Sequence, residues 1–176
     1  LKALQINKIK SGRKSQLRIS TKDANEFLQQ SDGFDYIDID PFGSPNFLLD
    51  TAIKRLARNG ILAITATDLA PLAGTSPKAC LRKYWAVPLR NELQHEIGLR
   101  ILLRKVQLIG AQYDKALQPL LSYHHQHYYR IFFRCTKSKT ACESIIAQHH
   151  YFLYCASCLS RKISSDNREA CSCKKD

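Results

Sequence analysis

A short acidic turn at residues 40–45, with the sequence Asp-Pro-Phe-Gly-Ser-Pro, carries the residue types best suited to chemistry. It follows an apolar run at residues 34–39 and precedes an amphipathic stretch that begins at Asn46. In α/β proteins reactive groups gather where parallel strands end, because the strand ends open into a crevice. The carboxylate of Asp40 and the carbonyl of Pro41 offer hydrogen-bond acceptors only, and Phe42 offers a stacking surface. This combination suits an amino nitrogen as the target. The alternative role for Asp40 is to cap the following helix.

A second polar turn follows the next predicted strand. Residues 61–66 form a near-continuous apolar run, as expected of a strand in a buried parallel sheet, and Thr67 and Asp68 come directly after it. Residues 69–83 contain prolines and a glycine and predict a long irregular segment. Long loops after a strand end usually serve as lids or binding loops. The two strand ends therefore predict one functional edge of a doubly wound sheet.

The charge of the chain predicts a polyanionic partner. The 176 residues include 27 Lys and Arg against 15 Asp and Glu, a formal net charge of +12. Arg82 and Lys83 adjoin Tyr84 and Trp85, and cations mixed with rings suit phosphate contact and base stacking. The alternative is a solvated basic rim with Trp85 packed in the core. We favour nucleic-acid contact because of the net charge.

Four cysteines near the end of the sequence have the spacing of metal ligands: Cys155, Cys158, Cys171 and Cys173. The first two form a CxxC pair, the usual metal knuckle, whereas the second two are separated by a single residue. We expect a structural zinc ion. The alternatives are reduced thiols without a metal and a ligand set that includes residues beyond this sequence.

The sequence shows neither a membrane-spanning segment nor a secretory signal. There is no apolar run of about 18 residues that would predict a membrane span, and no signal peptide. We therefore expect an intracellular protein, in the cytoplasm or nucleus, with no membrane association and no obligate protein partner. The chain contains no methionine and opens on what reads as the end of a helix, so it is interpreted as a fragment.

The hydrophobic pattern predicts the elements around these groups. Asp38 lies in the strand at residues 34–39, on the same face as Asp40, and we expect it to accept backbone N–H bonds. Asp23 is an expected helix cap and Gly60 an expected helix end. Helices are predicted at residues 25–30, 46–59, 89–104 and 143–150, and further strands at residues 16–20, 106–111, 128–135 and 151–154.

The last two strands before residue 136 are expected to pair as an antiparallel hairpin. The loop between them carries His124, His125 and His127, interpreted as polar loop residues because their spacing fits no compact ligand pattern. His95 is interpreted as part of a polar helix face with a Glu96–Arg100 ion pair, rather than as a metal ligand. A polar break at residues 137–139 is the predicted domain boundary.

Together the motifs resemble the tRNA (guanine-26, N2)-dimethyltransferase family. The likeness rests on the turn at residues 40–45, on the stretch Thr-Ala-Thr-Asp-Leu-Ala-Pro-Leu-Ala-Gly at residues 65–74, and on shorter matches such as Tyr128-Tyr129-Arg130. The resemblance implies an α/β fold, a partial doubly wound class I methyltransferase sheet with a late antiparallel strand. Residues 1–136 would be the C-terminal half of the catalytic domain, and residues 137–176 the start of a small C-terminal domain.

The resemblance also implies site residues. Asp23 and Ala24 match the family's Asp-Ala that meets the adenine of S-adenosyl-L-methionine. The implied catalytic residues are Asp40, Pro41 and Phe42, with Asp40 and Pro41 also at the cofactor. The implied substrate-binding residues, for tRNA, are Phe42, Ser44, Thr67, Asp68, Arg82 and Lys83.

The sequence also departs from the family pattern. The Gly-rich loop that binds the methionine end of the cofactor, and the acidic residue for its ribose, would both precede Leu1. Two other interpretations therefore stay open. One is an amino methyltransferase that acts on DNA or another RNA, and the other is an inactive or RNA-binding fragment with a zinc knuckle.

Overall fold

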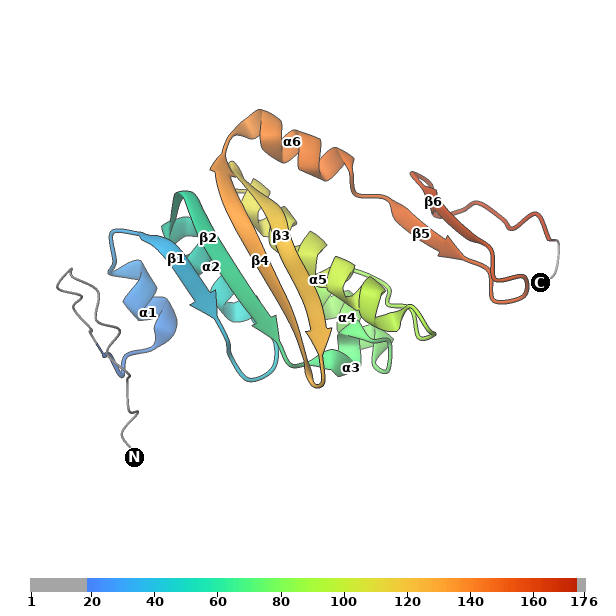
Figure 1. The fold of residues 1–176 in the computed structure, drawn as a ribbon, viewed down its shortest axis with the longest axis horizontal. Helices are drawn as coiled ribbons and strands as arrows, with labels where there is room; N and C mark the ends of the chain where they lie inside the picture. The colour runs from blue at the N-terminus through green and yellow to red at the C-terminus, as the bar shows by residue number, and fades with distance from the viewer. Residues whose placement is uncertain (1–18, 174–176) are drawn as a thin grey trace.

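A four-stranded mixed sheet lies at the centre of the computed structural model, which describes residues 19–173 (Figure 1). Its strand order is β1-β2-β4-β3. β1 (Phe34–Ile39) and β2 (Leu56–Ala66) are parallel, while β4 (Tyr128–Lys137) runs antiparallel to β2 and to β3 (Lys115–His125). The predicted α/β sheet with a late antiparallel strand is confirmed.

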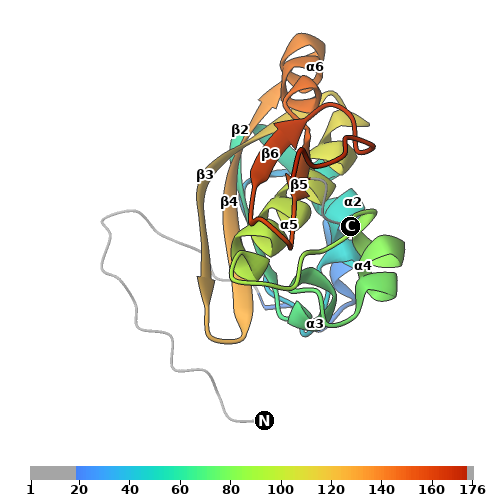
Figure 2. The same ribbon diagram turned by 90° about the vertical axis from the view of Figure 1, so that its right-hand side faces the viewer.

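Helices α2 (Asn46–Arg55) and α5 (Gln94–Ala111) pack against one face of this sheet. Figure 2 shows α2 and α5 on one side of β3 and β4, and no helix among residues 19–173 covers the other side, which we call the open face. The remaining elements complete the chain in order. The bounds are α1 Ala24–Gln29, α2 Asn46–Arg55, α3 Leu69–Leu72, α4 Pro77–Tyr84, α5 Gln94–Ala111, α6 Lys139–Ala147, β5 Tyr151–Tyr154 and β6 Arg161–Ser164.

Helix α5 is longer than predicted and includes residues 106–111, so the strand predicted there is wrong. Leu99, Leu102, Val106 and Ile109 recur at helical spacing and are all buried against the sheet. A short apolar run cannot be assigned to strand or buried helix by periodicity alone, which explains the error. The helix also begins at Gln94, later than predicted.

The partner of β4 in the hairpin is therefore the segment that was predicted to be a loop. β3 contains Pro119, where the register with β4 shifts by one residue. Proline is tolerated there because β3 is an edge strand of the sheet and the register is already irregular. The strand brings His124 opposite Tyr129, at the same sheet edge as the ends of β1 and β2.

Helix α2 ends at Arg55, before Gly60, so the prediction of Gly60 as its end is wrong. The ammonium of Lys115 donates to the carbonyl oxygens of Ile53 (2.7 Å) and Leu56 (2.6 Å), which satisfies groups at the end of the helix. Residues 57–60 then bulge out of the pairing with β1, and Asn59 adopts a left-handed conformation with φ 64°. This bulge carries the chain back into register with β1 at Ile61.

The N-terminal elements agree in part with expectation. Asp23 caps α1, because its Oδ1 accepts from the N–H groups of Asn25 (2.9 Å) and Glu26 (3.2 Å). Residues 16–18 of the predicted first strand lie outside the described residues, and residues 19–20 are not in a strand. The segment at residues 69–83 contains the short helices α3 and α4 instead of an irregular loop.

The C-terminal elements begin with α6, capped by Ser138. Cys142 and Ile145 of this helix form a small second core with Ala116 of β3. The hairpin of β5 and β6 follows, of which only β5 was predicted, and α6 begins earlier than predicted. The boundary at residues 137–139 stays a prediction.

Candidate active site

A groove of about 540 Å³ lies between α1 and β1 and leads to the turn at residues 40–45. It brings Ala24, one of the residues expected at the cofactor, together with Asp40 and Pro41. Its walls are largely apolar and include the rings of Phe27 and Phe34. The volume falls within the range of small-molecule sites, and a groove with apolar walls and carboxylates suits a ligand with a flat base and a positive charge.

The acidic turn itself is exposed at the end of β1. Asp40 is exposed and the ring of Phe42 is fully accessible to solvent. The N-cap of α2 is Pro45, without a side-chain cap, so the alternative role of Asp40 as a helix cap is wrong. An exposed carboxylate next to a free ring leaves both available to a ligand.

Two hydrogen bonds fasten this turn to the end of β2. The Oγ1 of Thr67 accepts from the N–H of Gly43 (2.6 Å), and the N–H of Thr67 donates to the carbonyl of Gly43 (3.0 Å). Gly43 has a φ of 84°, a backbone conformation that favours glycine. The structure thus brings the two predicted strand ends together and makes Thr67 a support of the acidic turn.

Asp68 belongs to a second connection between the same turns. The hydroxyl of Tyr84 in α4 donates to Asp68 Oδ1 (2.6 Å) and lies 3.0 Å from the Oγ of Ser44. Lys83 forms an ion pair with Asp68 Oδ2 at 3.3 Å. Burial, together with the hydrogen bond to Asp68, raises the pKa of Tyr84 far above its ordinary value, so the phenol remains a donor.

We expect Tyr84→Phe to loosen this connection without disturbing the core around the completely buried ring. The substitution removes the bonds to Asp68 and Ser44, and loss of a buried hydrogen bond to a charged group costs about 1–3 kcal/mol. Chemical unfolding of the chain should show a lower midpoint with an unchanged slope. An equal effect of Tyr113→Phe, a tyrosine bonded to Asp50 away from the turns, would contradict a special role for Tyr84.

Asp38 is held by side chains, so the expectation of backbone N–H partners is wrong. Its Oδ2 pairs with Arg130 at 2.6 Å and accepts a hydrogen bond from the hydroxyl of Tyr36 at 3.0 Å. Arg130 also donates to the Oγ1 of Thr65 at 2.5 Å. The network joins β1, β2 and β4 across the open face and leaves Asp40 as the free carboxylate next to it.

The cations and rings at residues 82–85, at the end of α4, lie in different environments. Tyr84 is buried and cannot stack on a base, so that part of the prediction is wrong. Trp85 is about half exposed, and the ammonium of Lys105 lies 2.8 Å from its ring centroid, so the alternative of a core tryptophan is also wrong. Arg82 is exposed and borders a second hollow of about 420 Å³ at the start of α4. Arg82 thus remains available to a phosphate.

Two histidines link α5 to the β3–β4 hairpin. The rings of His95 and His124 stack with centroids 3.8 Å apart and planes 8° apart, and His95 Nδ1 lies 3.1 Å from the Tyr129 hydroxyl. The interpretation of His124 as a polar loop residue is therefore wrong. The Glu96–Arg100 ion pair is confirmed at 2.6 Å.

This stack predicts a pH dependence of stability. Burial, and then the neighbouring His124, lowers the pKa of His95 below its ordinary value of 6.5. The unfolded chain therefore binds a proton more readily than the folded chain, and stability should fall as the pH drops below about 6.5. We expect lower unfolding midpoints at pH 5.5 than at pH 7.5, with a smaller difference in His95→Gln. His127→Gln, at an exposed position of the hairpin turn, should keep the difference of the parent.

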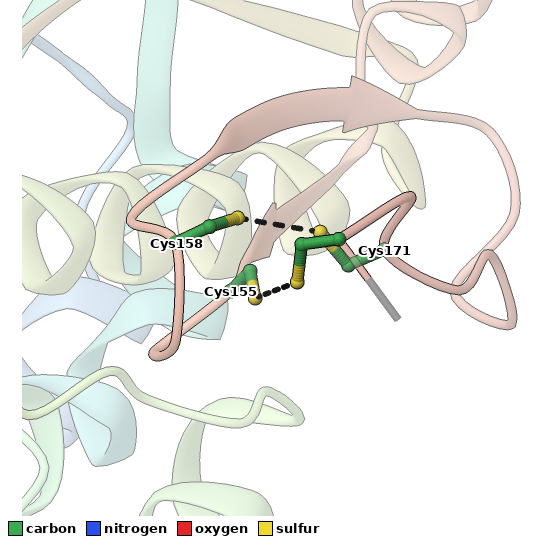
Figure 3. A group of neighbouring side chains, drawn as sticks. Cys155, Cys158 and Cys171 are labelled. Atoms are coloured by element: carbon green, nitrogen blue, oxygen red, sulfur yellow. Dashed lines mark hydrogen bonds between the residues drawn. The ribbon is translucent and has the colours of Figure 1, made fainter. Parts of the chain in front are cut away.

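The four predicted metal ligands come together in the C-terminal hairpin (Figure 3). The sulfur atoms of Cys155, Cys158, Cys171 and Cys173 all lie within 4.8 Å of one another, with Cys155–Cys173 at 3.6 Å and Cys158–Cys171 at 3.5 Å. A tetrahedral zinc ion with bonds of about 2.3 Å separates its sulfur ligands by about 3.8 Å. The donor set and spacing therefore fit zinc, despite the single residue between the last two cysteines.

The roles that the sequence does not predict are those that depend on residues far away in the sequence. Arg130 of β4 pairs with Asp38 of β1, and Tyr84 of α4 donates a hydrogen bond to Ser44 in the acidic turn. The alternation of β4 was the available signal for Arg130, because it places Tyr128 and Arg130 on the face opposite buried Tyr129.

Comparisons with known proteins identify the relatives of this chain. A profile of the family described as N2,N2-dimethylguanosine tRNA methyltransferase matches residues 2–176. A protein of Aquifex aeolicus (strain VF5) named tRNA (guanine(26)-N(2)/guanine(27)-N(2))-dimethyltransferase is 45% identical over 146 residues, 82% of this chain and 37% of its own length. A Pyrococcus furiosus protein named tRNA (guanine(26)-N(2))-dimethyltransferase is 52% identical over 115 residues, 65% of this chain and 30% of its own length.

A solved structure shares the fold. It is described as a complex of Trm1 from Pyrococcus horikoshii with S-adenosyl-L-methionine, and it matches with a TM-score of 0.80 and 38% identity over 86% of this chain and 41% of that one. The fold is thus a partial class I methyltransferase fold. The chain spans less than half the length of these relatives. No helix in the part of the chain that the structure describes is long and apolar enough to cross a membrane.

Proposed function

This chain belongs to the N2,N2-dimethylguanosine tRNA methyltransferase family. We propose that it supplies the part of the active site that carries out methyl transfer in a tRNA guanine-N2 methyltransferase. The substrate would be the exocyclic amine of guanine at position 26, giving the N2-methyl and N2,N2-dimethyl products. The observation that carries the proposal is the exposed turn of Asp40, Pro41 and Phe42 at the mouth of the groove.

Asp40 and Pro41 would prepare the amine for attack. The nitrogen is a poor nucleophile because its lone pair is delocalised into the base. Two acceptors aimed at its two hydrogens, the Asp40 carboxylate and the Pro41 carbonyl, favour a pyramidal nitrogen with an exposed lone pair. The carboxylate also stabilises the positive charge that develops on the nitrogen. The methyl group moves from the sulfonium sulfur, whose C–S bond breaks, to the nitrogen, and one N–H proton leaves to solvent. A single N–H then remains, which Asp40 can hold for a second transfer.

Phe42 would hold the base itself. The amine of a paired guanine is occupied by pairing and stacking, so the nucleotide has to leave the helix to reach Asp40. The ring of Phe42 is fully exposed and can stack on the extruded base, a contact worth about 1–3 kcal/mol. The Thr67–Gly43 bonds and the Tyr84 connection would fix the turn during this step, because catalysis by positioning requires a rigid support.

We infer that S-adenosyl-L-methionine would lie in the groove and supply the methyl group from its sulfonium. Asp23 and Ala24 would meet its adenine, and Asp40 and Pro41 would border the methyl-bearing end. The Oδ1 of Asp23 already caps α1, so its Oδ2 would be the acceptor for the adenine amine. The apolar walls with Phe27 and Phe34 suit the flat face of the base.

The remaining assignments concern the RNA and the C-terminal elements. Arg82, with Lys83 next to it, would contact tRNA phosphates in a salt-dependent way, while Ser44, Thr67 and Asp68 would act mainly by shaping the turn. Residues 137–176 would begin a separate C-terminal domain with a structural zinc ion. A tRNA substrate would place the protein inside the cell.

Methyl transfer by a version extended to the length of the relatives tests the proposal. The extended protein is incubated with an unmodified tRNA transcript and S-adenosyl-L-methionine, and the nucleosides are then analysed by mass spectrometry. We expect N2-methyl- and N2,N2-dimethylguanosine, both lost when guanine 26 is replaced by adenine. Methylation of duplex DNA at a similar rate, or no methylguanosine, would contradict the proposal.

A further inference from the structure

We propose that the tip of the β3–β4 hairpin, with Tyr123, His125 and Tyr128 on the open face, stacks on bases of the substrate RNA beside the target guanine. The inference rests on the proposed function for the identity of the RNA. It assigns a recognition surface to a segment outside the acidic turn and the basic helix α4.

The strand register places this tip at the end of the sheet where the acidic turn lies. Ala66, the last residue of β2, pairs with Tyr129, so Tyr128 lies beyond the end of β2, where Thr67 begins the second turn. The ends of β1 and β2 and the hairpin tip lie at the same end of the sheet (Figure 1).

Alternation along the hairpin divides its rings into two sets. His124 and Tyr129 point toward the helices, where His124 is covered by the parallel ring of His95. Tyr123, His125 and Tyr128 lie on the open face and meet only edge to face, Tyr123–Tyr128 at 73° and His125–Tyr128 at 64°. No ring among residues 19–173 stacks in parallel on these three, and uncovered ring faces are what a base stacks on.

The chemistry of the tip favours bases over phosphates. Residues 123–128 contain no lysine or arginine, although the chain as a whole carries a net charge of +12. Tyr123 and His125 are exposed, as is Phe42 on the acidic turn. Exposed rings thus lie both on the acidic turn next to Asp40 and on the hairpin tip at the same end of the sheet, where they would contact an extruded nucleotide and its neighbour.

The test measures binding of the 176-residue chain to a fluorescent, unmodified tRNA transcript by anisotropy at several salt concentrations. The double variant His125→Leu with Tyr128→Leu should lose affinity on the order of tenfold, with an unchanged slope of log affinity against log salt. Arg82→Gln with Lys83→Gln should instead reduce the slope, because phosphate contacts release counterions. Tyr128→Phe keeps the ring and should bind like the parent.

A matched control is Tyr151→Leu, at an exposed tyrosine of β5, a strand that lies apart from the ends of β1 and β2 (Figure 1). This variant should bind tRNA like the parent. Circular dichroism and thermal unfolding of each variant check that the sheet is intact. The inference is overturned if the double variant binds within twofold of the parent, if Tyr151→Leu loses as much, or if the parent chain does not bind tRNA. Methylation by the extended protein decides the proposed function separately.

Discussion

Asp40→Asn, in a version extended to the length of the relatives, should lower methyl transfer to tRNA by about 10²–10³-fold. The substitution keeps the shape of the side chain and replaces one acceptor oxygen by an NH₂ donor, which would face the hydrogens of the amine. It also removes the negative charge that stabilises the developing cation. Because Asp40 is exposed and neither caps α2 nor joins the Asp38–Arg130 pair, stability should change little.

The experiment separates chemistry from binding. Single-turnover methyl transfer is measured with labelled cofactor, and tRNA affinity is measured in parallel by anisotropy. We expect the rate constant to fall while the affinity stays within a fewfold of the parent. Asp35→Asn, an exposed aspartate on the same strand, serves as the matched control and should react like the parent. Activity of Asp40→Asn within a fewfold of the parent would show that the carboxylate has no catalytic role.

The acidic turn was predictable because its geometry is local. A buried strand that ends in Asp-Pro-Phe fixes where the carboxylate lies relative to the sheet, and β1 has the predicted bounds. The cysteine cluster was predictable for the same reason, since a CxxC pair specifies its own turn. Each of these signals depends on a few neighbouring residues.

The parts that could not be predicted depend on contacts between distant residues. Residues 106–111 have the composition of a strand, and only the continued burial of α5 against the sheet makes them helical. The end of α2 depends on Lys115, which is about sixty residues away in the sequence. The sequence predicts Tyr84 as a ring for RNA, but its burial and its hydrogen bond to Asp68 make it a support of the turn. Tertiary packing overrides local pattern in each case.

The hydrogen bonds that hold the acidic turn explain how the end of a strand could serve the proposed methyl transfer. The turn needs an exposed carboxylate and ring, yet exposed loops are mobile. Here Thr67 and the Tyr84 hydroxyl connect it to the end of β2 and to α4, and the Asp38–Arg130 pair fixes the strand before it. Under the proposed function, Asp40 and Phe42 would remain open to the substrate because their neighbours are held.

Loss of zinc should have the second large effect, confined to the C-terminal hairpin. Four thiols within 4.8 Å of one another match the Cys₄ sites of structural zinc, whose binding contributes directly to folding, about 10–16 kcal/mol in small zinc fingers. We expect the purified chain to hold one zinc ion per molecule. Removal by a chelator should raise amide exchange in β5 and β6. It should leave β1, β2 and β4 protected, because they pack in a separate core.

Cysteine variants decide whether the cluster holds the metal. Cys158→Ser replaces one ligand and should lose most of the zinc, measured by elemental analysis after dialysis. Cys142→Ala, at a buried cysteine of α6 outside the cluster, should keep one zinc ion per chain. Equal zinc content in both variants, or no zinc uptake by the parent chain, would contradict the site. A rise of amide exchange in the strands of the main sheet on chelation would show that the folding of the C-terminal hairpin is coupled to the main sheet. The predicted boundary at residues 137–139 would then be wrong.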